Sequence, residues 1–372
     1  MVPALPDVLS GRLRLDALTG PLDPATGSIV DVIHEEVRRI DLEAHRIETA
    51  EQTLAYDYLI IANGSAPAYF GFQPSGGTLH SVHSIEAATR FRTALEEHLS
   101  RDPSAPVVIV GAGYTGLEVA ACLRAGTRAA AAAGAGRGAA GPAARHPAAP
   151  RITVVERSDT VLGFLHERER ERVLQYFADI DVDIRTGTVL EDYDGSTAVL
   201  SDGTRAENSL VCWAAGMRAD PTPINGEVER LPDGRIRTTA ALQLPGYPRV
   251  FAAGDAAALE KDGTVARRAV NFSFYSGRRA GRNVAAAIGG RRLRDFRPVD
   301  LGWIIPLGEE SVGRVFGAIR VGRRVGLRMH YAMCGFRQFA GADKWEFYRT
   351  ALHLRRTPQP LQFRAPEVSP DV

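Results

Sequence analysis

Short unbroken runs of apolar residues recur along the chain, separated by longer polar stretches. Runs of four or five apolar residues predict strands that are buried on both faces, as in parallel sheets. The strands predicted in this way are Tyr58–Ala62, Val107–Val110, Arg151–Val155, Leu210–Ala214 and Arg249–Ala253. Their spacing leaves room for helices between them, so the pattern predicts an α/β fold.

The remaining segments follow the helical or the alternating period. Helical spacing predicts helices at Arg90–Leu99, Glu167–Phe177 and Val270–Ile288, the last with Gly277 and Gly281 as close-packing positions. Polar and apolar residues mix in the predicted strands Val30–Ile40, Asp41–Thr49, Val182–Arg185, Val189–Asp192 and Ala198–Leu200. From Phe296 onward the pattern is again typical of strands, with glycines between them.

A glycine-rich turn follows the strand Val107–Val110. Gly111, Gly113 and Gly116 form a GxGxxG motif, and a helix-like segment begins at once. The first glycine permits the tight turn, the second lets the backbone approach a pyrophosphate, and the third lets helix and strand pack closely. Strand, turn and helix occur in the required order, so we predict a dinucleotide site here.

Glu156 ends the next predicted strand. A carboxylate at this point accepts hydrogen bonds from the adenine ribose and repels a 2′-phosphate, which favours NADH over NADPH. Its distance from the glycines exceeds the roughly 20 residues that are usual. The excess lies in 125–150, a tract of Ala, Gly, Arg and Pro without apolar periodicity. We expect a solvated surface insertion there, with a functional tail as the alternative.

Composition excludes several classes of protein. The chain has 372 residues, 45% hydrophobic and 24% charged, as in soluble globular proteins. No apolar run approaches the roughly 18 residues of a membrane span, and the first residues do not resemble a signal peptide. The cysteines Cys122, Cys212 and Cys334 match no metal or redox spacing, so we expect buried, reduced thiols, no metal and a cytoplasmic location.

Charge is distributed unevenly along a chain whose formal net charge is +1. The segment from Arg291 onward carries 15 Lys and Arg against 8 Asp and Glu. A basic region of this kind can be a solvated face, a site for an acidic partner or a membrane-surface patch. Nothing in the sequence points to nucleic acid.

The ordered motifs YDYLIIANGS, VVIVGAGYTGLEVA, ITVVE, VCWAAG and VFAAGD resemble the two-dinucleotide flavoprotein reductases. They are most similar to the type II NADH dehydrogenases, the single-chain NADH:quinone oxidoreductases. The resemblance implies two Rossmann-like three-layer domains, with the NADH domain inserted into the FAD domain. We therefore assign 1–102 and 218–290 to FAD, 103–217 to NADH, and 291–372 to acceptor or membrane interaction.

The resemblance also implies roles for individual residues. Gly254 and Asp255 would meet the ribityl and phosphate portion of FAD, with Gly64 and Ser65 beside it. Ala215 and Gly216 would line the nicotinamide side, and Glu118 would lie near the nicotinamide–flavin contact as a catalytic residue. Two alternatives stay open, because Asp255 could cap a helix and Glu118 could face solvent.

The chain departs from the family in two ways. The family begins with its own GxGxxG unit for FAD, whereas this chain starts after it. We expect a start codon assigned too late, and a chain that really lacks part of its flavin site is the alternative. The helix on the quinone side usually carries glutamines, where this chain has Asn271 and Tyr275 in AVNFSFYSG. Both side chains can bond a carbonyl, but a packed helix with Phe272 and Phe274 in the core is the alternative.

The C-terminal stretch Lys344–Arg356 places Trp345, Tyr348 and Leu352 at helical spacing beside basic residues. Such a helix suits an anionic membrane surface, or it packs on its own domain. The resemblance favours peripheral attachment to the inner face of the cell membrane, and it leaves a homodimer open.

We therefore predict an FAD-dependent oxidoreductase that passes hydride from NADH to flavin and electrons to a quinone. The alternatives are an NADH-dependent reductase of a ferredoxin or rubredoxin, and a redox-inactive NADH-binding protein.

Overall fold

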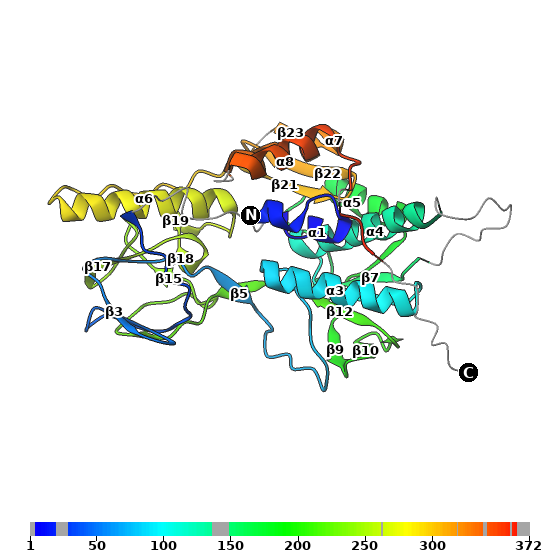
Figure 1. The fold of residues 1–372 in the computed structure, drawn as a ribbon, viewed down its shortest axis with the longest axis horizontal. Helices are drawn as coiled ribbons and strands as arrows, with labels where there is room; N and C mark the ends of the chain where they lie inside the picture. Colours follow the sequence, from blue (N-terminus) through cyan, green and yellow to red (C-terminus); the bar gives the residue numbers. More distant parts are fainter. Residues whose placement is uncertain are drawn as a thin grey trace. The chain divides into compact units, whose positions relative to one another are not determined.

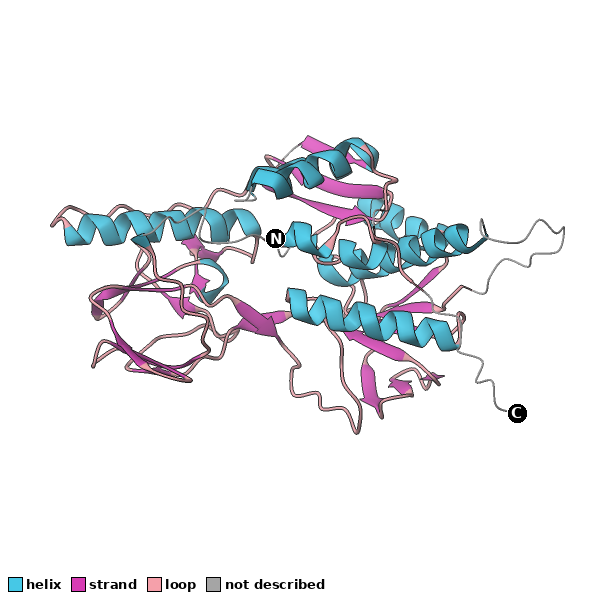
Figure 2. Cartoon of the chain, viewed as in Figure 1, coloured by secondary structure: helices cyan, strands magenta, loops and turns pink. Residues whose placement is uncertain are grey.

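The computed structural model describes residues 4–19, 29–135, 149–261, 263–317, 319–337, 341–357 and 359–362. These residues form an α/β fold of two compact units, drawn in Figures 1 and 2. Unit 1 comprises Met1–Gly27, Tyr69–Gly216 and Gly302–Val372, and unit 2 comprises Ser28–Ala68 and Met217–Leu301. The domain bounds assigned from the sequence concern the cofactor that each segment serves, and they stay a prediction.

A parallel sheet forms the centre of unit 1. Its strand order is β12 (Leu210–Trp213), β6 (Val107–Val110), β7 (Ile152–Val155) and β8 (Val182–Arg185). Every residue of β6 and β12 is buried, as their unbroken apolar runs predict. Helix α4 (Tyr114–Ala135) packs on β6 and β7, α5 (Glu167–Asp179) on β8, and α3 (Ile85–Arg101) on β12.

Two antiparallel sheets and several helices complete unit 1. One sheet contains β9 (Leu190–Tyr193), β10 (Ala198–Leu200) and β11 (Arg205–Ala206). The other contains β21 (Gly302–Leu307), β22 (Glu310–Val315) and β23 (Ile319–Gly322), against which α7 (Arg323–Arg337) packs. Helix α8 (Gly341–Leu352) packs on α7.

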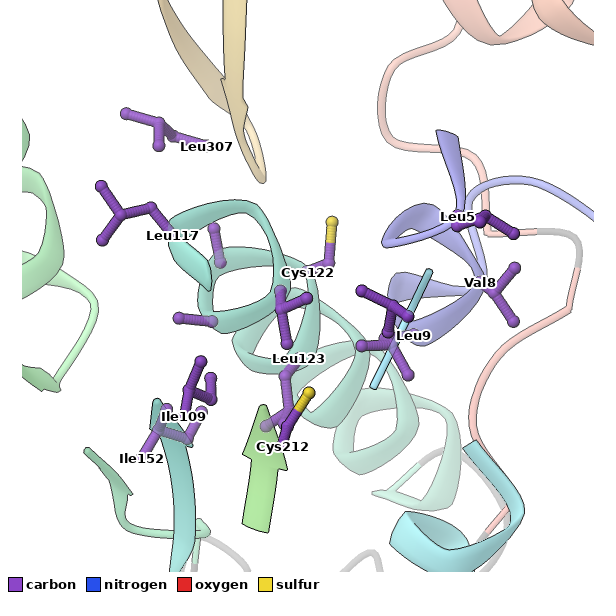
Figure 3. Packing of buried hydrophobic residues seen from close by; sticks show 14 of the residues in the cluster. Leu5, Val8, Leu9, Ile109, Leu117, Cys122, Leu123, Ile152, Cys212 and Leu307 are labelled. Carbon is purple, nitrogen blue, oxygen red and sulfur yellow. The ribbon is translucent and has the colours of Figure 1, made fainter. Parts of the chain in front are cut away.

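The main core of unit 1 surrounds α4. Figure 3 shows Ile109 of β6 and Cys212 of β12 on one side of this helix, and Leu9 on the other. Leu9 belongs to α1 (Asp7–Ser10), a single helical turn that packs on α4, and η2 (Leu15–Leu18) follows it and packs on α8. Cys122, Cys212 and Cys334 are all buried and free, which confirms the prediction of buried thiols.

Unit 2 is built from short strands and one long helix. Its largest sheet has the order β14 (Ile224–Asn225), β1 (Val37–Asp41), β2 (Arg46–Thr49) and β3 (Thr53–Ala55). A second sheet has the order β16 (Gln243–Leu244), β17 (Tyr247–Ala252) and β4 (Leu59–Ile61), with β4 and β17 parallel. Helix α6 (Val270–Ile288) packs on β17 and on the short helix η4 (Gly254–Ala256).

Pairs of very short strands complete unit 2. They are β5 (Ser65–Pro67) with β13 (Met217–Ala219), β15 (Ile236–Arg237) with β18 (Ala257–Ala258), and β19 (Glu260–Lys261) with β20 (Thr264–Val265).

The structure corrects four predictions of local structure. Helix α4 continues to Ala135, so the surface insertion does not begin at 125, because an alanine-rich tract favours helix; 136–148 lie outside the described residues. The strand predicted from Val30 begins at Val37, and the strand-like pattern predicted from Phe296 begins at Gly302. A Cβ atom at Gly277 or Gly281 would meet no atom within 4 Å, so these glycines are not close-packing positions.

Candidate functional site

The glycine-rich turn has the geometry that its motif predicts. Gly111 has φ +104°, and a Cβ there would lie 2.6 Å from the Cα of Ala215. A Cβ at Gly116 would lie 1.8 Å from the carbonyl oxygen of Gly111, so helix and turn approach as closely as only glycine allows. A Cβ at Gly113 would meet nothing within 4 Å. The backbone at Gly113 is therefore open to an approaching group.

Helix α4 begins immediately after this turn, at Tyr114. The first backbone N–H groups of a helix have no partner within it, and they carry the positive end of the helix dipole. The turn thus combines accessible backbone with a helix N-terminus, as a pyrophosphate site requires.

Glu156 reaches back to the same turn from the end of β7. Its Oε2 accepts a hydrogen bond from the N–H of Ala112 at 2.8 Å, and its Oε1 accepts one from the N–H of Ser158 at 2.9 Å. These bonds fix the carboxylate beside the glycines while its side chain stays partly exposed. Each oxygen retains a lone pair that can accept a hydroxyl proton.

Ala215 and Gly216 follow β12 and lie beside the turn. Ala214 donates its N–H to the carbonyl of Val110 at 2.8 Å, which continues the pairing of β12 and β6. Gly216 has φ +150°, and a Cβ there would lie 3.2 Å from the ring of Phe70. Unit 1 therefore brings together all the residues predicted for NADH.

The residues predicted beside FAD gather in unit 2. Asp255 lies in η4, where its Oδ2 accepts a hydrogen bond from Ser65 Oγ at 3.0 Å and its Oδ1 one from Ser273 Oγ at 3.1 Å. Gly254 has φ +67°, and its N–H donates to Ser276 Oγ at 2.9 Å. Helix α6 has Ala269 at its N-cap, so Asp255 does not cap that helix.

The neighbouring Gly64 has φ +77°, and a Cβ there would meet nothing within 4 Å. Gly254, Asp255 and Ser273 line a small pocket together with Arg235, Arg267 and other residues. The sequence did not indicate Ser273 or Ser276, because serines in a helix are common and their contacts join segments that are distant in the chain.

Asn271 and Tyr275 lie four residues apart on α6 but differ in environment. Asn271 is buried, with its side-chain N–H donating to the carbonyl of Val299 at 3.1 Å. The Tyr275 side chain is 42% exposed. Phe272 is buried and Phe274 is half-buried. The alternative prediction, a packed helix with both rings in the core, therefore holds for Phe272 and only in part for Phe274. The role of Asn271 and Tyr275 toward an acceptor stays a prediction.

Glu118 lies on α4, two residues after Gly116, and is partly buried rather than facing solvent. Burial raises the pKa of Glu118 well above its usual range, and the nearby Asp7 carboxylate raises this pKa further. Burial and Asp7 therefore both favour the protonated form of this carboxyl group.

Asp7 belongs to a buried polar network that sequence analysis missed. Its carboxylate lies 3.6 Å from the Nη1 of Arg12, and both side chains are 4% exposed. The Tyr331 hydroxyl donates to Asp7 Oδ1 at 2.6 Å and accepts from Arg12 Nη1 at 2.9 Å. Burial raises the pKa of Asp7, while Arg12 and Tyr331 oppose that shift. The network lies on the side of α4 that carries Glu118 and Cys122.

Comparison with known families identifies this arrangement. Residues 11–282 match the sequence model of the family described as pyridine nucleotide-disulphide oxidoreductase. The chain belongs to this family. Membership confirms the α/β fold and the predicted cofactor pair, FAD and a pyridine nucleotide.

Individual relatives are more distant. The chain is 30% identical over 267 residues to an NADH dehydrogenase-like protein of Mycobacterium tuberculosis, covering 69% of this chain and 61% of that protein. It is 24% identical over 324 residues to the type II NADH:quinone oxidoreductase of Staphylococcus aureus, covering 79% of this chain and 74% of that protein. The chain thus spans 61% of the length of the first of these relatives.

Solved structures agree with the fold. A water-forming NADH oxidase from Lactobacillus brevis superposes with a TM-score of 0.67 at 17% identity, covering 84% of this chain and 66% of that one. The putidaredoxin reductase–putidaredoxin complex gives a TM-score of 0.64 at 20% identity, covering 84% and 71%.

The residues of this chain fit both cofactors in part. An accessible backbone at Gly113, a helix N-terminus and a fixed carboxylate at Glu156 suit the pyrophosphate and ribose of NADH. Asp255, held by two serine hydroxyls in a pocket, suits a ribityl hydroxyl of FAD. We assign no residue to the FAD pyrophosphate.

The described residues contain no cluster of His, Cys, Asp and Glu that could hold a metal ion. None of the described helices is long and apolar enough to cross a membrane.

Proposed function

We propose that this oxidoreductase takes hydride from NADH onto FAD and passes the electrons to a quinone. The observation that carries the proposal is the gathering of Gly111, Gly113, Gly116 and Glu156 at one end of the unit 1 sheet. The names of the M. tuberculosis and S. aureus relatives support NADH as donor, and the second supports quinone as acceptor.

The NADH site works by positioning. The N–H groups after Gly113 hold the pyrophosphate, and the missing side chain at Gly113 leaves the backbone open to it. Glu156 accepts the ribose hydroxyls, while its charge excludes a 2′-phosphate. Ala215 and Gly216 line the side of the site where the nicotinamide lies.

The flavin site is pre-organised by hydroxyl groups. When bound, FAD supplies the chemistry that joins a two-electron donor to its acceptor. Ser65 and Ser273 fix both oxygens of Asp255, so this carboxylate is the residue that would accept a hydrogen bond from a ribityl hydroxyl of FAD. Gly64 and Gly254 keep backbone accessible beside it.

Glu118 supplies a proton. Reduction of a quinone to a quinol consumes two electrons and two protons, whereas hydride transfer delivers only one proton equivalent. Burial and the nearby Asp7 raise the pKa of Glu118, which favours the protonated form that a proton donor needs. We assign Glu118 as a proton donor in the reduction of the acceptor.

The C-terminal helix supports attachment to a membrane surface. On α8, Phe347 is buried against its own unit, whereas Trp345 and Leu352 are 65% and 68% exposed. Arg349 is exposed beside them. One face of α8 thus packs on the fold, and the other presents an aromatic and a basic residue, as interfacial helices do.

The experiment compares two electron acceptors on the full chain purified with FAD. Wild-type protein should oxidise NADH with a short-chain ubiquinone and with ferricyanide, which accepts electrons without protons. Glu118→Gln should slow quinone reduction about 10²-fold and leave the ferricyanide rate within a few-fold. Glu171→Gln, an exposed carboxylate on α5, is the matched control and should change neither rate.

Three outcomes would contradict parts of the proposal. Activity with ferricyanide but not with quinone would refute the acceptor. Equal losses with both acceptors would refute the proton role of Glu118. Binding of NADH without any bound flavin would favour a redox-inactive protein. Flotation with phosphatidylglycerol vesicles tests attachment, which Trp345→Ala should weaken.

A further inference from the structure

Arginines are concentrated in one segment of unit 2. Residues 267–297 contain nine arginines, no lysine and a single acidic residue, Asp295. The segment comprises helix α6, labelled in Figure 1, with the residues that lead into and out of it. Such a density of like charge creates a positive potential over the surface that carries it.

Most of these arginines are exposed, and they form no ion pair with an acidic residue in the part of the chain that the structure describes. Among the residues that the structure describes, the ion pairs of this segment are Arg267 with Asp300 and Arg268 with Asp233. The exposed arginines are Arg278, Arg282, Arg291, Arg292, Arg294 and Arg297. Their charges are therefore available to a partner.

Helix α6 has one face that packs on unit 2 and an opposite, exposed face that carries arginines, called the arginine face below. Asn271, Phe272, Ser276, Ala280 and Asn283 are buried. Arg278 and Arg282 stand four residues apart on the exposed side, with the open glycine positions 277 and 281 next to them. Like charges at this spacing destabilise a helix, so the arrangement is not one that stability alone favours.

Two exposed apolar side chains lie at the ends of this face. Tyr275 is 42% exposed and Ile288 is 67% exposed. They are about 20 Å apart along the helix axis, a span comparable to one side of a standard protein interface. Aromatic and arginine side chains are enriched at such interfaces, whereas lysine is depleted.

The arginine face belongs to the helix that holds the flavin site. Ser273 and Ser276, in the first turns of α6, contact Asp255 and Gly254. A partner on this face would therefore lie close to the flavin, provided that the proposed function is correct.

We propose that the arginine face of α6 is a docking surface for a small acidic electron-carrier protein. Arginine pairs with carboxylates in a bidentate geometry that lysine lacks, so a surface of Asp and Glu is the matching chemistry. A membrane surface fits less well, because helix α6 contains no Trp or Leu to enter the lipid.

The test uses a plant-type [2Fe–2S] ferredoxin as the acidic probe and the full chain with FAD. Binding is measured by calorimetry at low and moderate salt. The double variant Arg278→Gln with Arg282→Gln should bind about three- to tenfold more weakly than wild type, with a smaller dependence on salt. The pair Arg324→Gln with Arg328→Gln, exposed at the same spacing on α7, is the matched control and should bind as wild type does.

The outcomes separate this proposal from the proposed function. Neither double variant should change NADH oxidation with ferricyanide, so failure of that reaction in wild type refutes the function rather than the docking. Absence of ferredoxin binding, or equal loss in both double variants, refutes the docking surface. If the α6 double variant loses binding to phosphatidylglycerol vesicles but still binds ferredoxin, this face binds a membrane and the proposal is wrong.

Discussion

Replacing Glu156 with glutamine should abolish the preference for NADH over NADPH. In wild type one carboxylate oxygen bonds the N–H of Ala112 at 2.8 Å and the other bonds the N–H of Ser158 at 2.9 Å, so the charge is fixed beside the ribose site. Glutamine keeps the size and one acceptor oxygen, but it removes the charge and turns an N–H donor toward one backbone N–H.

The magnitude follows from two effects. A hydrogen bond to a charged group contributes about 1.5–3 kcal/mol, so NADH should bind about 10- to 100-fold more weakly. Repulsion between the carboxylate and a 2′-phosphate about 4 Å away is on the order of 4 kcal/mol at an effective dielectric of 20. Because the variant removes this repulsion, NADPH should bind more tightly than to wild type, helped by the adjacent Arg157.

Calorimetric titration with NADH and NADPH measures both changes, and Glu171→Gln is the control. The two dissociation constants should approach each other in Glu156→Gln only. If wild type binds NADPH as tightly as NADH, or if the variant retains the wild-type preference, the assignment of Glu156 is wrong. Far-ultraviolet circular dichroism shows whether the variant is folded before its affinities are compared.

Three further predictions concern stability. Gly116→Ala should lower the free energy of unfolding in urea by several kcal/mol, because the added Cβ would meet the Gly111 carbonyl. Gly277→Ala has open space and should stabilise α6 by up to about 1 kcal/mol, so equal effects of the two substitutions would refute the close packing at Gly116. Tyr331→Phe removes the hydroxyl shared by Asp7 and Arg12 and should cost about 1–3 kcal/mol, and an unchanged unfolding midpoint would show that water replaces it. Burial lowers the pKa of His330 from 6.5 to about 4, so the unfolded chain binds a proton between these values that the folded chain does not. Stability should therefore fall as pH drops through this window, by at most about 1.4 kcal/mol per pH unit, and a His330→Gln variant with an unchanged slope would exclude His330 as the cause.

Strands β6 and β12 of the unit 1 sheet could be predicted because burial on both faces leaves an unbroken apolar run. Val182–Arg185 and Ala198–Leu200 have the predicted bounds, and β6 and β12 differ from the prediction by at most one residue. Helix α7 was missed, since the segment Arg323–Arg337 mixes arginines with glycine and small residues and follows a region of strand-like pattern. The start of the alanine-rich tract lacks amphipathic periodicity, so its hydrophobic pattern does not predict a helix, although alanine favours one.

Some residues of the candidate site could likewise be predicted from the sequence, and others could not. The glycine turn and Glu156 could be identified because their roles depend on the backbone and on a short motif. The bonds of Asp255 to Ser65 and Ser273 could not, since they depend on how unit 2 folds. The network of Asp7, Arg12 and Tyr331 joins the two ends of the chain, and no local pattern indicates such a contact.

The central claim is that NADH bound at the glycine turn of this oxidoreductase reduces its flavin. The most direct measurement mixes the FAD-loaded full chain with NADH in the absence of oxygen and of any acceptor, and follows the visible absorbance of oxidised flavin. If the claim is correct, this absorbance is lost rapidly with NADH and far more slowly with NADPH. Flavin that stays oxidised while NADH is bound would contradict it.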